Sequence, residues 1–183
     1  MKSFFFFVVL SAVCFSISAA QQDSATSVKV VHFKKLQEFL PSLDVKGFKR
    51  GKPIGATESS SGMSMSEASV RYATEPGEND TVQQQTIEIK IVDMSQVPGW
   101  AQAYQLANFE RETEDGYEKS VSVKGYKGIE KAQTGDSKSC SLNFAVGTRF
   151  NVSLEGSGFQ DIKMLNSLVD SMDLAELEKT TGE

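Results

Sequence analysis

The residue types that most often carry out catalysis are few in this 183-residue chain. It contains one histidine, His32, and two cysteines, Cys14 and Cys140. A cysteine nucleophile needs a base within hydrogen-bonding distance, and about a hundred residues separate His32 from Cys140. His32 falls within a predicted helix, and Cys140 shares one face of a predicted strand with Leu142 and Phe144, which favours a buried, inert thiol. We therefore predict no catalytic residues.

Carboxylate side chains are numerous but scattered along the chain. The densest run is Glu110, Glu112, Glu114 and Asp115. Such a run could bind a divalent cation, but neither the EF-hand spacing nor another ligand loop accompanies it. A zinc site would need three or four Cys, His or acidic ligands at defined spacing. The sequence therefore predicts no metal site and no cofactor, and we interpret the acidic run as a solvated turn.

Aromatic residues beside glycines form the candidate binding site. Trp100 follows Pro98-Gly99, Tyr104 comes about one helical turn later, and Tyr117 and Tyr126 each follow a glycine. Aromatic side chains at the rim of a sheet can line a ligand cleft. They can equally close the open end of a small core, and the sequence leaves both readings open. We predict ligand or partner binding by Trp100, Tyr104, Tyr117 and Tyr126.

The first half of the chain must position these side chains through two helices and a hairpin. Apolar periodicity predicts a helix over residues 28–40, which Pro41 ends because proline disfavours the helical conformation of the residue before it. Alternating apolar residues predict strands at 63–74 and 84–92, joined as a hairpin. The segment between the first helix and this hairpin is rich in glycine and is interpreted as a connection. A second helix is predicted at 100–109.

The second half of the chain predicts four strands and a final helix. The strands cover residues 117–124, 126–133, 139–146 and 149–155. Because the links are too short for crossover helices, these strands should be antiparallel neighbours. Residues 159–172 show a helical apolar stripe. The predicted fold class is α+β, with an antiparallel sheet of about six strands in two runs (two strands, then four) and three helices on one face.

The first twenty residues have the pattern of an export signal. Lys2 precedes an apolar run over residues 4–13, and small residues follow before Gln21. This run is too short to cross a bilayer, which needs about 20 residues. We predict a signal peptide at 1–20, a flexible leader at 21–27, a single domain at 28–177 and a polar tail at 178–183. The expected location is periplasmic or secreted, with no membrane span after cleavage.

The net charge limits the class of partner. The chain has 19 Lys and Arg against 24 Asp and Glu, a formal net charge of −5. An acidic surface repels the phosphates of nucleic acids, so no nucleic-acid partner is expected. Signal cleavage would leave Cys140 as the one cysteine, so no intrachain disulfide is expected.

Several short motifs resemble a known pattern. They are Gly116-Tyr117-Glu118-Lys119, Gly125-Tyr126, Arg149-Phe150-x-Val152-x-Leu154-Glu155-Gly156-x-Gly158 and Met172-Asp173-Leu174-x-x-Leu177. Together they resemble a family of uncharacterised exported bacterial proteins whose domain corresponds to residues 33–177 here. The order of elements is similar to the PsbP-like α+β sandwich. The first resemblance implies export, the second implies a fold, and neither supplies an activity or catalytic residues.

These observations favour an exported, non-enzymatic envelope or secreted protein that binds an unknown partner protein or a small-molecule ligand. A metal-dependent or carboxylate-based hydrolase is one alternative, because carboxylates scattered in the sequence can converge in space. A structural or assembly subunit is the other.

Overall fold

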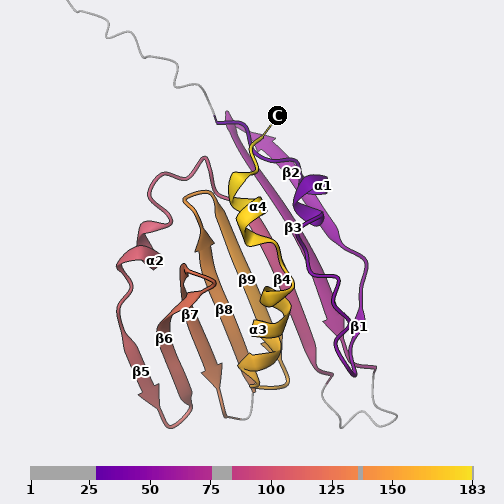
Figure 1. Cartoon of the computed structure of the whole chain (residues 1–183), viewed down its shortest axis with the longest axis vertical. Coiled ribbons are helices and arrows are strands. Elements are labelled where there is room, and N and C mark those ends of the chain that lie inside the picture. Colours follow the sequence, from indigo (N-terminus) through magenta and orange to yellow (C-terminus); the bar gives the residue numbers. More distant parts are fainter. Residues whose placement is uncertain (1–27, 76–83, 136–137, 183) are drawn as a thin grey trace, which may run out of the picture.

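The computed structural model describes residues 28–75, 84–135 and 138–182. Within these ranges, an antiparallel sheet has the strand order β1-β3-β4-β9-β8-β7-β6-β5, and β2 also pairs with β3 (Figure 1). The strands are β1 (Lys49–Arg50), β2 (Ile54–Ser60), β3 (Met63–Ala73), β4 (Thr86–Asp93), β5 (Glu110–Thr113), β6 (Gly116–Val123), β7 (Tyr126–Gln133), β8 (Ser139–Val146) and β9 (Phe150–Ser157). The helices are α1 (Phe33–Gln37), α2 (Gln102–Leu106), α3 (Ile162–Asp170) and α4 (Leu174–Lys179).

The predicted fold class was wrong in its elements, because the described chain has nine strands and four short helices rather than about six strands and three helices. Two unpredicted strands, β1 and β2, lie in the segment interpreted as a connection. β2 and β3 form a hairpin around Ser61 and Gly62, whose φ angles of 52° and 81° suit a two-residue hairpin turn. A third unpredicted strand, β5, lies in the acidic run that was interpreted as a solvated turn. These are edge strands with largely exposed side chains, so they lack the apolar alternation that marks a buried strand.

The helices are also shorter than predicted. The first begins only at Phe33, and His32 is its N-cap rather than an interior residue, with Nδ1 accepting a hydrogen bond from the Lys34 N–H at 3.3 Å. The predicted helix over 159–172 corresponds to α3, and α4 is a further helix that was not predicted. Asp173 starts this helix, because its carboxylate accepts from the Glu176 N–H at 3.0 Å as an N-cap. None of the described helices has the length and apolarity needed to span a membrane.

One face of the sheet forms the core. The predicted hairpin strands correspond to β3 and β4, and the four later strands correspond to β6–β9, each pair antiparallel as expected. Their inward residues pack beneath α1, α3 and α4, which Figure 1 shows crossing the same side of the sheet. Fully buried examples are Ile89, Leu154 and Phe144 on the sheet and Leu165 on α3. Each such side chain contributes about 1.5–3 kcal/mol of transfer free energy.

A buried ion pair closes one end of this core. The Asp93 carboxylate, at the end of β4, has no exposed side-chain surface and accepts from Arg149 Nη2 at 2.8 Å and Nε at 3.1 Å. It also accepts from the backbone N–H of Val31 at 2.7 Å and of Ser95 at 3.0 Å. The same guanidinium donates to the Lys29 carbonyl at 2.7 Å. The pair therefore joins β4, the turn before β9 and the segment that precedes α1.

We expect Asp93→Ala to lower the free energy of unfolding by about 3–5 kcal/mol, because it leaves a mostly buried guanidinium without its counter-ion. Urea denaturation followed by circular dichroism measures this change. Glu75→Ala is the matched control, since the Lys49–Glu75 pair is 80% exposed on both sides and contributes little. Equal effects of the two substitutions would contradict a structural role for the buried pair.

Candidate functional site

The face of the sheet opposite α1, α3 and α4, here called the open face, carries polar side chains in register. Because side chains alternate between faces, residues that pair across neighbouring strands form continuous rows over this surface. One row, the charged row, crosses the sheet from β3 to β5 through Arg71, Glu88, Glu155, Ser141, Lys131, Glu118 and Arg111. The adjacent row is here called the amide row after Asn143. It consists of the polar residues Ser69, Lys90, Ser153, Asn143 and Ser120 and the apolar residue Ile129.

Adjoining depressions lie along these rows. One of about 460 Å³ extends from Arg71 across Glu88 and Glu155 to Lys131. Another of about 400 Å³ lies between Glu88, Glu155, Lys90 and Asn143, and reaches Asn151 and Ser153. They share Glu88 and Glu155, so they form one continuous polar surface over the middle of the sheet.

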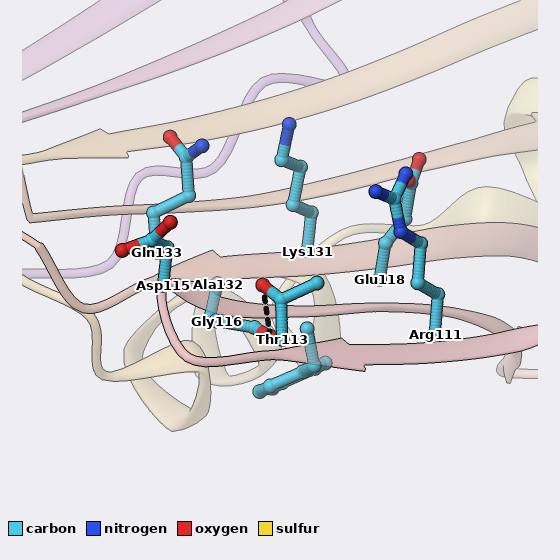
Figure 2. Close-up of a pocket in the computed structure, with 9 residues that line it drawn as sticks. Arg111, Thr113, Asp115, Gly116, Glu118, Lys131, Ala132 and Gln133 are labelled. Carbon is cyan, nitrogen blue, oxygen red and sulfur yellow. Dashed lines mark hydrogen bonds between the residues drawn. The ribbon is translucent and has the colours of Figure 1, made fainter.

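A third depression continues this surface toward the β5 edge. It has a volume of about 280 Å³ and is lined from β5, β6 and β7. Figure 2 shows the Arg111, Glu118, Lys131 and Gln133 side chains rising on the same side of these strands. Lys131 and Gln133 also line the larger depression beside Glu155. The polar surface therefore extends from the centre of the sheet to its edge.

The charges on the open face nearly balance. Across β3–β9, five bases stand among four acids: Arg71, Lys90, Lys127, Lys131 and Arg111, and Glu67, Glu88, Glu155 and Glu118. Among them, the described residues show one ion pair, a loose contact of 3.8 Å between Lys90 and Glu67. The open face is therefore an array of donors and acceptors with almost no internal pairing.

Two carboxylates meet at the centre of this array. Glu88 and Glu155 are direct partners across β4 and β9. Like charges placed opposite one another on an antiparallel pair are destabilising. Local choices that oppose folding stability tend to occur at functional sites, so this pair marks the centre of the candidate site.

Trp100 and Tyr104 form a rim at one end of the open face. They lie in the long connection from β4 to β5, which contains α2. Figure 1 shows α2 beside β6 and β7. The indole Nε1 donates to the Thr148 carbonyl at 2.9 Å, and the Tyr104 hydroxyl donates to Asn151 Oδ1 at 3.2 Å. The two rings meet edge to face at 6.1 Å between centroids, and burial raises the pKa of Tyr104. Through Tyr104 this pair contacts Asn151, which lines one of the depressions.

Tyr117 and Tyr126 lie on the other face of the sheet. The Tyr117 hydroxyl donates to Glu130 Oε1 at 2.7 Å, and the Tyr126 hydroxyl donates to Glu178 Oε2 at 2.9 Å. Burial, followed by the hydrogen bond to the carboxylate, raises the pKa of each tyrosine to about 12. The structure therefore brings Trp100 and Tyr104 together and separates them from the other two aromatic residues.

The remaining reactive residues do not converge. Cys140 is buried, and that burial raises the pKa of its thiol to about 11. His32 is exposed at the start of α1. In residues 28–75, 84–135 and 138–182, no group of three or more His, Cys, Asp or Glu side chains is arranged to hold a metal ion.

Sequence reasoning missed the residues at the centre of the open face. The alternation of β4 placed Glu88 and Lys90 opposite the isoleucines, which was a usable signal for their face. No local signal paired Glu88 with Glu155, since 67 residues separate them. Asn143 and Asn151 likewise become neighbours of this pair only through the β8–β9 and β4–β9 registers.

Comparisons of the chain with protein-family models, with curated proteins and with solved structures find no match.

The raised pKa values predict a loss of stability at alkaline pH. The ordinary pKa values are 9.0 for Cys140 and 10.0 for Tyr117 and Tyr126, and folding raises them to about 11 and about 12. Between these limits the unfolded chain has lost protons that the folded chain retains, so the free energy of unfolding falls as pH rises. Urea denaturation at a series of pH values measures the slope. Tyr117→Phe/Tyr126→Phe should show a shallower fall above about pH 10, and an unchanged slope would contradict this assignment.

Proposed function

We propose that this protein is an exported binding protein whose open face holds a neutral, polyhydroxylated ligand of the oligosaccharide type. The observation that carries the proposal is the array of polar side chains in the charged and amide rows, which have almost no pairing among themselves, with its adjoining depressions. The signal-like first twenty residues support export to the periplasm or medium.

The chemistry of the face favours hydroxyl groups. Each hydroxyl is both donor and acceptor, and the depression around Asn143 offers amides, carboxylates, an ammonium group and a serine hydroxyl side by side. Side chains repeat across the strands at a spacing of about 4.8 Å. A chain of sugar units, with hydroxyls along its length, suits such a repeating surface.

The nearly balanced charge argues against polyanionic ligands. A nucleic acid or sulfated polymer would be attracted by a large excess of Lys and Arg, whereas the open face carries nearly as many acids as bases. The centre of the face is also unlike a protein interface, whose buried core is apolar and poor in charged residues. A small polar ligand therefore fits this surface better than a partner protein.

The Trp100–Tyr104 rim supports the same ligand class. Both rings are partly exposed, and the Tyr104 hydroxyl bonds to Asn151, which lines the adjacent depression. An aromatic face can pack against the apolar side of a sugar ring, while the neighbouring amides bind its hydroxyls. The rim and the rows would then contact one ligand.

Titration with neutral oligosaccharides such as cellohexaose and chitohexaose should change the emission of Trp100, the one tryptophan in the chain. Asn143→Ala/Ser153→Ala should weaken binding about tenfold, because it removes hydrogen bonds of about 0.5–1.5 kcal/mol each. Calorimetry measures the affinity of both proteins. Asp170→Ala, on α3 beyond the opposite face, is the control and should bind normally.

Two results would contradict the proposal. One is the absence of saturable binding across a panel of neutral oligosaccharides. The other is equal binding by the wild type and the Asn143→Ala/Ser153→Ala variant. Chromatography of the incubated ligand tests the hydrolase alternative, since release of shorter oligosaccharides that is lost in Glu88→Gln would make the protein an enzyme.

A further inference from the structure

A separate cavity lies on the helix-bearing side of the molecule, away from the open face. It has a volume of about 720 Å³, within the range of small-molecule sites. The segment before α1 supplies Lys29 and His32, the β2–β3 hairpin supplies Ser59 and Ser64, and α4 supplies Glu176. Ile54 of β2 pairs with Ser69 and therefore lies on the open face. Thr57 and Ser59 lie on the opposite face of the same strand, so this cavity and the open face are distinct surfaces.

The cavity is electropositive, although the chain as a whole is acidic. Lys29, His32 and Lys35 line it together with a single acid, Glu176. That acid lies 3.7 Å from Lys179, which offsets its charge. Lys35 already binds Glu38 at 2.6 Å, whereas the Lys29 ammonium makes no ion pair in the described chain. The ammonium of Lys29 therefore leaves the wall with a net positive charge.

The remaining donors suit an oxyanion. Because His32 Nδ1 accepts from the Lys34 N–H, the neutral ring carries its proton on Nε2, which has no partner in the described chain. Thr181 adds a hydroxyl to the same wall. Ammonium, imidazole and hydroxyl donors form the shortest and strongest hydrogen bonds with charged oxygens.

The cavity wall is held in place before any ligand binds. Gln96 Nε2 donates to the Val28 carbonyl at 2.9 Å, and its Oε1 accepts from the Ser64 N–H at 2.6 Å. The Phe33 N–H donates to Thr57 Oγ1 at 3.0 Å. The Arg149 guanidinium holds the Lys29 carbonyl at 2.7 Å. A wall fixed in this way lowers the entropic cost of binding.

We propose that this cavity binds a small oxyanion-bearing molecule, a carboxylate or phosphate, at a site independent of the open face. Lys29 and the His32 Nε2–H would contact the charged oxygens, and Thr181 and the hairpin serines would contact polar groups farther along the ligand.

Nuclear magnetic resonance of the imidazole tests the site directly, because His32 is the one histidine in the chain. Titration with citrate and with inorganic phosphate should shift its carbon-bound proton signals saturably at constant pH and ionic strength. Stronger binding of citrate than of phosphate would identify a carboxylate ligand, and the reverse a phosphate. The emission of Trp100 should not change, which separates this site from the open face.

The Lys29→Gln variant should weaken the binding of the preferred anion about tenfold. Its side chain is exposed, and the hydrogen bond to Arg149 uses its backbone carbonyl, so the fold should survive. Lys49→Gln removes an exposed charge elsewhere and is the matched control. Absence of a saturable shift up to about 10 mM of either anion, or equal weakening by both substitutions, would overturn the proposal.

Discussion

The buried pair of Asp93 and Arg149 is the contact on which the arrangement of both candidate surfaces depends. It fixes the end of β4 against the turn before β9 and holds the segment before α1 through Val31 and Lys29. Burying two charges is costly unless they are paired and fully hydrogen-bonded. Here the carboxylate accepts two guanidinium and two backbone bonds, so the geometry meets that condition.

This pair also links the two surfaces physically. The connection that carries Trp100 and Tyr104 to the rim of the open face leaves β4 at Asp93. On the opposite side, the segment held by Arg149 forms part of the wall of the His32 cavity. A single ion pair therefore positions the rim of one surface and the wall of the other.

The alternation of side chains along each strand places the residues that stabilise the fold on one face of the sheet and the candidate binding residues on the other. Successive side chains of a strand point to opposite faces. Ile87, Ile89 and Ile91 therefore enter the core, while Glu88 and Lys90 between them reach the open face. The core can stay well packed while the charged row carries opposed carboxylates. The stabilisation comes from one face and the binding chemistry from the other.

The sequence alone determined the strands with strong alternation, β3, β4 and β6–β9, and the burial of Cys140, because side-chain periodicity is a local property. It did not predict β1, β2 or β5, whose edge positions carry no such signal, or the separate helix α4 that begins after Asp173. Only the tertiary structure decided that Glu88 meets Glu155, that Trp100 and Tyr104 border the open face, and that Tyr117 and Tyr126 lie behind it. The physical reason is that alternation assigns a residue to a face, whereas its neighbours on that face depend on strand order and register, which arise from pairing between distant segments.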